Sequence, residues 1–358
     1  MDKVIVMEKN KNWNSELSLY IKNGEPTSME KAKIWETAIG LQDVDGLKPS
    51  KYLIENVREH VEGNIDLKEV EERIDSYYKT LDNRKTDEVK NTEEADKVAV
   101  RIAEILNENS FNFNPTELVD IHRRLFSGIF DGASKIRDYN FTKKEWILNG
   151  DTVIYASYET ILPALQYDFE LEKSFSYKDL SLDESIKHLC RFTSNIWQVH
   201  PFCEGNTRTT AVFIIKYLRT FGFNINDDVF AKHSWYFRNS LVRANYKNFN
   251  KNVFEDISFL EKFFYNLLTN SNFELKNRYT HIDYNSGVLE TKQEYKSYTL
   301  EQQAIINIIK DNEEINQQEI AVMINKSLRT VKNIMTDMQE KGLIIRRNGK
   351  RDGRWEIL

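Results

Sequence analysis

Nine consecutive positions, from His200 to Arg208, hold side chains that together could transfer a phosphorus-containing group. His200 titrates near neutral pH, so its imidazole can take a proton from an incoming hydroxyl. Glu204 offers the hard carboxylate oxygens that Mg²⁺ prefers, and Arg208 can bind two phosphate oxygens at once. Gly205 lets the backbone approach a ligand closely. These residue types at this spacing predict a site for nucleotidyl or phosphoryl transfer.

Helical patterns on both sides predict how these residues are positioned. Apolar residues recur at helical spacing over residues 186–196, before the stretch, and over residues 211–218, after it. The stretch is therefore expected in a short loop that opens into the N-terminus of a helix. Free N–H groups and the helix dipole give such a terminus a partial positive charge, which makes phosphate the expected ligand.

The run His-Pro-Phe-Cys-Glu-Gly-Asn-Thr-Arg resembles the signature of Fic-domain enzymes, His-Pro-Phe-x-(Asp/Glu)-Gly-Asn-(Gly/Lys)-Arg. That family mostly transfers AMP from ATP to a hydroxyl group of a target protein. The resemblance implies His200 as the general base, Glu204 as the ligand of Mg²⁺, Asn206 and Arg208 as phosphate ligands, and Phe202 as the hydrophobic anchor of the loop. The implied nucleotide-binding residues are Phe202, Glu204, Gly205, Asn206, Thr207 and Arg208.

Two positions depart from the family pattern. Thr207 stands where glycine is usual, and its side chain would crowd the backbone around a phosphate. Ala211 stands where many members have a second arginine for the γ-phosphate. A degenerate, non-catalytic Fic fold that still binds a nucleotide therefore stays open as an alternative.

Residues 1–85 are predicted to form a small helical bundle. The helical patterns cover residues 30–41, with Ser28 as the cap, and then residues 52–61 and 67–81. This region is similar to the antitoxin module that accompanies some Fic enzymes, in which a glutamate of an inhibitory helix pairs with the second signature arginine. Asp45 is the inhibitory candidate here, and Ala211 stands where its arginine would be. We expect a packing element whose inhibition is weakened or absent; a purely structural bundle is the alternative.

Residues 86–270 are predicted to form the Fic domain. The expected helices are residues 93–107, 116–129, 158–173, 182–199, 209–221, 235–246 and 253–267, the first of them capped by Thr92. Asn149-Gly150 predicts a β-hairpin between residues 146–148 and 152–155. In Fic enzymes a hairpin at this place, the flap, holds the target by strand addition. An ordinary surface hairpin is the alternative.

Residues 271–297 are polar and are predicted to be a linker, and residues 298–358 are predicted to form a winged helix-turn-helix. Ser327 is expected to cap the recognition helix. The DNA-binding candidates are Arg329, Lys332, Arg346, Arg347, Lys350 and Arg351. Such a basic cluster attracts phosphates, while a winged helix used for protein contacts or dimerisation is the alternative.

The composition indicates a globular protein with more than one domain. Of 358 residues, 40% are hydrophobic and 30% are charged. The net charge of −6 argues against nucleic-acid binding over the whole surface, but not against a local basic patch. Cys190 and Cys203 are too few for a disulfide framework. No leader pattern or apolar run of membrane-spanning length occurs, so a cytoplasmic location without membrane contact is expected.

Together these patterns predict a mainly α fold: a Fic helical domain with a β-hairpin flap, an N-terminal small helical bundle and a C-terminal winged helix-turn-helix. The predicted function is that of a protein AMP-transferase that uses ATP and Mg²⁺, in which His200 deprotonates a Ser, Thr or Tyr hydroxyl of a target protein. The rival is a nucleotide-sensing, DNA-binding regulator with a catalytically weak Fic domain. DNA is a second expected partner, and the oligomeric state, a homodimer included, is left open.

Overall fold

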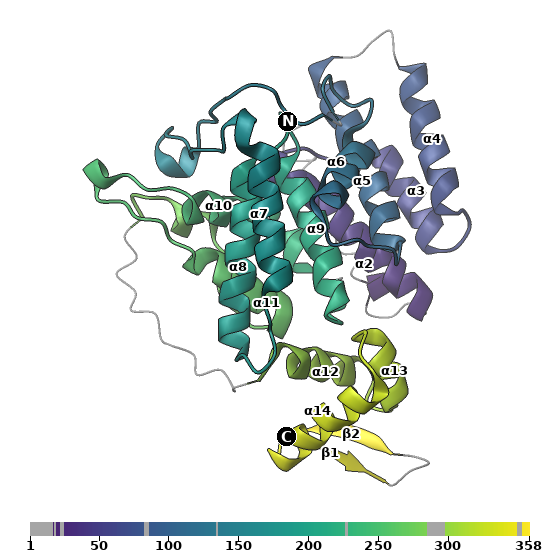
Figure 1. Ribbon diagram of the computed structural model, residues 1–358. Coiled ribbons are helices and arrows are strands. Elements are labelled where there is room, and N and C mark those ends of the chain that lie inside the picture. The colour runs from purple at the N-terminus through teal and green to yellow at the C-terminus, as the bar shows by residue number, and fades with distance from the viewer. Residues whose placement is uncertain are drawn as a thin grey trace.

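The computed structural model describes residues 17, 19–21, 25–81, 86–133, 135–225, 228–284, 298–348 and 353–358. Within these ranges the protein is mainly α-helical, as predicted, with a two-stranded antiparallel sheet near its C-terminus. Figure 1 shows a helical body with the N-terminal helices along one side, in purple and blue, and the C-terminal domain below it, in yellow. No described helix is both long and apolar enough to cross a membrane.

The N-terminal helices are α2 (Pro26–Gly40), α3 (Lys51–Val61) and α4 (Leu67–Thr80), and the short 3₁₀ helix η1 (Leu41–Asp45) follows α2 directly. Ser50 and Asp66 cap α3 and α4 with their side chains. The prediction of Ser28 as a cap was wrong, because α2 already begins at Pro26, a residue that suits the first helical position.

The N-terminal helices pack against helix α5 (Asp87–Asn107) through α2 and α4. Thr86 caps α5, so the prediction of Thr92 as the cap was wrong and the helix starts at Asp87 instead of residue 93. The buried Asp96 accepts hydrogen bonds from Ser50 N at 2.8 Å, Ser50 Oγ at 2.5 Å and Tyr78 Oη at 2.8 Å. This one carboxylate therefore joins the start of α3 and the end of α4 to α5.

The body continues with α6 (Pro115–Phe126), α7 (Ile161–Ser174), α8 (Leu182–Val199), α9 (Asn206–Thr220), α10 (Asp228–Ala244) and α11 (Ser258–Thr269). Helix α8 has the predicted bounds, and Ser181 and Glu184 form a capping box at its start. Helix α9 begins earlier than predicted, because its first turn is made of buried polar residues that precede the apolar pattern.

Residues 139–156 contain the hairpin predicted over residues 146–155, and we call this whole segment the flap. Asn149 and Gly150 take the left-handed backbone of the predicted turn, with φ of 57° and 83°. The predicted strands are nevertheless absent from this described segment: Trp146–Leu148 form a 3₁₀ helix, η3, and residues 151–156 have no regular secondary structure. The side chains of Ile147, Leu148 and Val153 are buried, so packing on the body positions the flap in place of strand pairing.

The C-terminal domain consists of α12 (Leu300–Asp311), α13 (Gln317–Met323), α14 (Leu328–Glu340), β1 (Ile344–Arg347) and β2 (Arg354–Ile357). Asn316 caps α13, and Ser327 caps α14 as the sequence predicts. The strands pair antiparallel with Ile344 opposite Ile357, which gives the predicted helix-turn-helix with a wing.

This domain packs directly on the helical body (Figure 1). Leu182 N, at the start of α8, donates to Tyr298 O at 2.6 Å, and a Cβ on Gly222, just after α9, would lie 2.5 Å from Ile324. In the predicted linker, residues up to 284 lie against the body, where Ile282 N donates to Ile147 O at 2.9 Å. The rest of it, residues 285–297, lies outside the described residues.

Candidate active site

The loop between α8 and α9 turns sharply at both of its ends. His200 ends α8 in the left-handed conformation, with φ of 49°, and Gly205 precedes α9 with φ of 74°. A Cβ on Gly205 would lie 2.3 Å from the ring of Phe126, so only glycine fits there. The first turn of α9 thus begins directly after the loop, and its N–H groups have no acceptor within the helix.

The imidazole of His200 is buried at the mouth of this loop. Its Nδ1 lies 3.2 Å from Trp197 O, and its face stacks on Tyr155 of the flap with ring centroids 3.9 Å apart. Its Nε2 is buried and has no hydrogen-bond partner among the described residues. Burial, with a smaller contribution from Lys143, holds the pKa of His200 well below its usual value. The ring is therefore neutral at physiological pH, and Nε2 is free to accept a proton.

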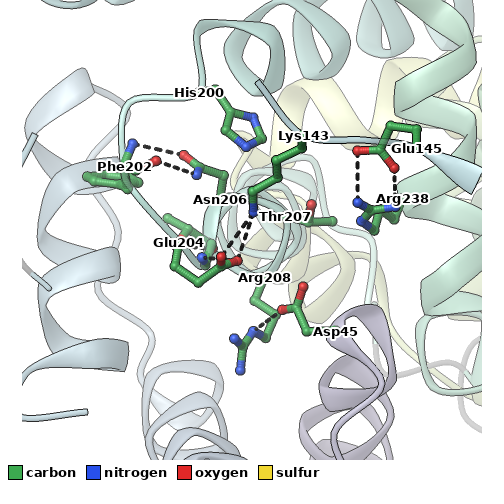
Figure 2. A network of polar contacts seen from close by, with 12 residues as sticks. Asp45, Lys143, Glu145, His200, Phe202, Glu204, Asn206, Thr207, Arg208 and Arg238 are labelled. Carbon is green, nitrogen blue, oxygen red and sulfur yellow. Dashed lines mark hydrogen bonds and ion pairs between the residues drawn. The ribbon is translucent and has the colours of Figure 1, made fainter. Parts of the chain in front are cut away.

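The backbone of the loop is held by the side chain of Asn206. Phe202 N donates to Asn206 Oδ1 at 3.0 Å, and Asn206 Nδ2 donates to Phe202 O at 2.8 Å (Figure 2). The ring of Phe202 stacks on His122 with centroids 3.6 Å apart, and His122 Nε2 lies 3.0 Å from Glu204 O. The ring of Phe202 is thus packed within the body, and the amide of Asn206 binds the loop itself in this conformation.

Arg137 is a site residue that sequence reasoning missed. Its guanidinium is buried and donates to backbone oxygens on both sides of the site, among them His200 O at 2.8 Å and Tyr139 O at 2.7 Å. Its own N–H donates to Pro201 O at 2.9 Å. Arg137 therefore ties the loop to the flap. A single arginine in a sequence with 30% charged residues carries no spacing signal that would have singled it out.

Glu204 forms an ion pair with Lys143, a second residue that the sequence analysis did not predict. Lys143 Nζ reaches down from the flap and lies 3.0 and 3.1 Å from the two carboxylate oxygens (Figure 2). Burial alone would raise the pKa of Glu204, but Lys143 and the N–H of Gly205 more than offset this effect and lower it. Glu204 is thus ionised and already holds a cationic group.

The chemistry of this carboxylate suits Mg²⁺. Among the described residues no three His, Cys, Asp or Glu side chains cluster as a metal site. A single carboxylate is nevertheless what Mg²⁺ uses when substrate phosphates and water supply its other oxygen ligands. Glu204 fits that role at the N-terminus of α9, and a site built wholly from protein ligands does not.

Arg208 is fully buried and engaged by the N-terminal helices. Its Nε lies 2.9 Å from Asp45 Oδ2, an ion pair without hydrogen-bond alignment (Figure 2). Its Nη1 donates to Gln42 Oε1 at 3.1 Å, and its Nη2 pairs with Glu94 Oε1 at 2.5 Å. The guanidinium also lies over the ring of Phe126, 4.7 Å from its centroid. Asp45 therefore pairs with Arg208, and the expectation that it had lost its arginine with the change to Ala211 was wrong.

Thr207, the unusual residue of the motif, points into the body. Its Oγ1 accepts a hydrogen bond from Trp197 Nε1 at 2.9 Å, so its side chain is anchored to α8. A narrow cavity remains between the motif, the flap and η1, with room for about one water molecule. It is lined by Asp45, Lys143, Tyr155, Trp197, His200, Glu204, Asn206, Thr207 and Arg238. The predicted nucleotide site is therefore closed in this conformation.

The C-terminal candidates lie at the surface, away from this cavity. Arg329 and Lys332 are exposed near the start of α14. On β1, Arg346 lies over the ring of Trp355 at 4.8 Å, and Arg347 pairs with Glu356 at 2.8 Å. Lys350 and Arg351 lie outside the described residues.

Comparisons with known proteins match both parts. Residues 112–218 match the Fic/DOC family, and residues 302–345 match a winged helix-turn-helix DNA-binding family. A curated relative, protein adenylyltransferase VbhT of Bartonella schoenbuchensis, is 26% identical over 161 residues. The match covers 42% of this chain and 32% of the relative, so the chain spans about a third of that protein's length.

Replacing Asn206 tests whether its amide holds the loop. Asn206→Ala would leave the N–H and C=O of Phe202 buried without partners, so the free energy of unfolding should fall by about 2–3 kcal/mol. Urea denaturation without nucleotide measures it. The control is Asn195→Ala, an exposed amide on α8, which should change it by less than about 0.5 kcal/mol. Equal stability of the two variants would mean that the amide does not hold the loop.

Proposed function

Because this chain is a Fic/DOC-family protein with a C-terminal winged helix-turn-helix, we propose that it is a protein AMP-transferase. The observation that carries the proposal is the buried, partnerless Nε2 of His200, which lies beside an ionised Glu204 at the start of α9. The donor is ATP and the acceptor is a Ser, Thr or Tyr hydroxyl of a protein target. The activity of the curated relative, as its name gives it, supports the choice of AMP.

In this mechanism His200 Nε2 accepts the proton of the target hydroxyl. The oxygen then forms a bond to the α-phosphorus of ATP, and the bond from that phosphorus to the pyrophosphate oxygen breaks. Trp197 O, 3.2 Å from Nδ1, fixes the tautomer by accepting a hydrogen bond from Nδ1–H, which leaves Nε2 unprotonated as the base. Bound Mg²⁺ would offset negative charge on the triphosphate, with Glu204 as its ligand from the protein. The N–H groups at the start of α9 would donate hydrogen bonds to the phosphates.

The flap is proposed to hold the target beside His200. Residues 151–156 have no regular secondary structure, and Ile154 is 80% exposed although its neighbour Val153 is buried. Backbone pairing with such a segment aligns a target hydroxyl while it specifies few of the target's side chains. In this conformation Ile154 O accepts a hydrogen bond from Gln198 Nε2 and Ala156 O accepts one from Arg137, so a target strand would pair with the remaining backbone groups of the flap or displace these bonds.

The N-terminal helices are proposed to inhibit the site. Asp45 and Gln42 of η1 bind Arg208, and η1 also lies against α10 beside the cavity. A triphosphate that uses Arg208 must displace these contacts, because the guanidinium is fully buried by them. Asp45 thus remains the inhibitory candidate, although it acts on Arg208 and the position of Ala211 is not involved.

The closed cavity favours one rival function. A site with room for about one water molecule suits a nucleotide sensor that opens rarely, coupled to a winged helix that binds DNA. In that case the Fic domain would bind ATP without transferring AMP. The basic side chains of α14 and β1 are the proposed DNA contacts, and a location in the cytoplasm stays a prediction from composition.

Transfer of label from ATP separates the two functions. Wild-type protein incubated with α-labelled ATP, Mg²⁺ and a cell extract should label a protein, and His200→Asn should reduce the rate about 10²–10⁴-fold through loss of the base. Asparagine tolerates the left-handed backbone at this position, so the loop is retained. ATP binding without any label transfer by the wild type would support the sensor and refute the transferase.

Neutralising Asp45 tests inhibition. Asp45→Asn keeps the size of the side chain but removes the charge that pairs with Arg208, so the initial rate of label transfer should rise about fivefold, as expected for an ion pair that is partly exposed. Asp43→Asn, in the same 3₁₀ helix and exposed, is the matched control and should leave the rate unchanged. A rate that does not rise with Asp45→Asn would remove η1 as an inhibitor.

Salt dependence tests the winged helix as a DNA-binding domain. The full chain should bind a short fluorescent duplex, and Arg329→Ala with Lys332→Ala should weaken binding and reduce the slope of log K against log salt by about 2. Fluorescence anisotropy over a series of salt concentrations measures both. Lys341→Ala, at the far end of α14, is the control. An unchanged slope would favour the use of this domain for protein contacts.

A further inference from the structure

Two ion pairs of opposite polarity join the flap to the walls of the cavity. Lys143 pairs with Glu204, and Glu145, two positions further along the flap, pairs with Arg238 of α10 (Figure 2). Alternate residues of an extended segment point to the same side, so both flap side chains reach the site together. One inserts a cation and the other inserts an anion.

Arg238 has the geometry of an oxyanion site. Its Nη1 lies 2.8 Å from Glu145 Oε2 and its Nη2 lies 2.9 Å from Glu145 Oε1, a bidentate arrangement that a phosphate can accept equally well. The side chain of Arg238 is 18% exposed, whereas that of Glu145 is 1% exposed. The guanidinium therefore lies at the wall of the cavity, next to Asp45 and His200.

Helix α9 offers no second cation to the site. Ala211 is buried and has no charged side chain, and Arg208 is enclosed by the N-terminal helices. Among the described residues that line the cavity, the cationic side chains are those of Lys143 and Arg238. A polyphosphate that enters beside Glu204 would therefore meet Arg238 as the guanidinium available on the α10 side.

We propose that Arg238 is the second phosphate-binding arginine of this site, and that Lys143 and Glu145 keep it closed by imitating the ligand. In the closed state the Lys143 ammonium sits on Glu204, where a divalent cation belongs, and the Glu145 carboxylate sits on Arg238, where a phosphate belongs. This inference rests on the proposed binding of a nucleoside triphosphate and assigns its β- and γ-phosphates to α10.

In this proposal Mg²⁺ replaces Lys143 on Glu204 and a phosphate replaces Glu145 on Arg238. This exchange explains why the site is closed without a ligand and can open when one binds. Each buried charge has an opposite charge in the closed state, so none is left unpaired. When Mg²⁺ and a polyphosphate enter, Glu204 and Arg238 keep a partner of the same sign as before, and Lys143 and Glu145 return to solvent with the flap. Binding of the nucleotide and opening of the flap are then one event.

Equilibrium binding to the full chain without a target tests the assignment. ATP, AMP and inorganic tripolyphosphate, each with Mg²⁺, are titrated by calorimetry. The double variant Glu145→Gln with Arg238→Met removes both charges and leaves none buried alone. It should weaken ATP and tripolyphosphate about 10- to 100-fold and AMP less than about twofold. Glu145→Gln alone should tighten ATP about threefold, because it removes the competing carboxylate.

Two exposed charges serve as controls: Arg123→Met on α6 and Glu170→Gln on α7 should leave all affinities unchanged. The inference is overturned if the double variant binds ATP as the wild type does, if it loses AMP as much as ATP, or if neither the wild type nor Glu145→Gln binds any of the three ligands. Label transfer that depends on His200 together with unchanged ATP affinity would refute the inference and leave the transferase standing. Binding of tripolyphosphate through Arg238 without ATP binding would support the assignment of Arg238 and refute the proposed transfer of AMP from ATP.

Discussion

The arrangement of the site depends on one buried guanidinium. Arg137 donates to the carbonyl oxygens of His200 and Val199 on one side and of Tyr139 and Ala156 on the other. These groups are the last turn of α8 and the two ends of the flap. Since a buried carbonyl without a donor is unfavourable, the loop and the flap hold this geometry together. The stacking of Tyr155 on His200, and the reach of Lys143 to Glu204, follow from that tie.

Around this tie, counter-charges from two distant parts of the chain close the site. The 3₁₀ helix η1 presents Asp45 and Gln42 to Arg208, and α5 presents Glu94 to it, while the flap presents Lys143 and Glu145 to Glu204 and Arg238. Each buried ionic group is therefore matched, as burial of charge requires. The two sets of counter-charges come from separate parts of the sequence but meet at one cavity, which Asp45, Lys143, Glu204 and Arg238 line together.

The parts of this architecture that have a local sequence signal could be predicted. Ser181 and Glu184 mark the start of α8, Asn316 and Ser327 mark the starts of α13 and α14, and the motif itself marks the loop. The strands of the flap were predicted wrongly, because the Asn-Gly turn forms but side-chain burial replaces the ladder.

What could not be predicted are pairings over long sequence separations. Arg137, Lys143 and Arg238 are ordinary cations in a chain with 50 lysines and arginines, and only the tertiary fold brings them to the motif. Asp45 was found through its place in the sequence, yet its partner was assigned to the wrong position of α9. Glu94 lies in a helix that was predicted, but no local signal links it to Arg208, 114 positions later in the sequence.

The contact of the C-terminal domain with the helical body fixes the position of α14 relative to His200. Tyr298 meets the first residue of α8, and Ile324 meets Gly222 so closely that no side chain fits between them. Helices α8 and α9 thus run from the loop that holds His200 at one end to the winged helix at the other. A duplex held by α14 would keep a set distance and bearing from His200, so the chemistry would be confined to proteins standing on one side of that duplex.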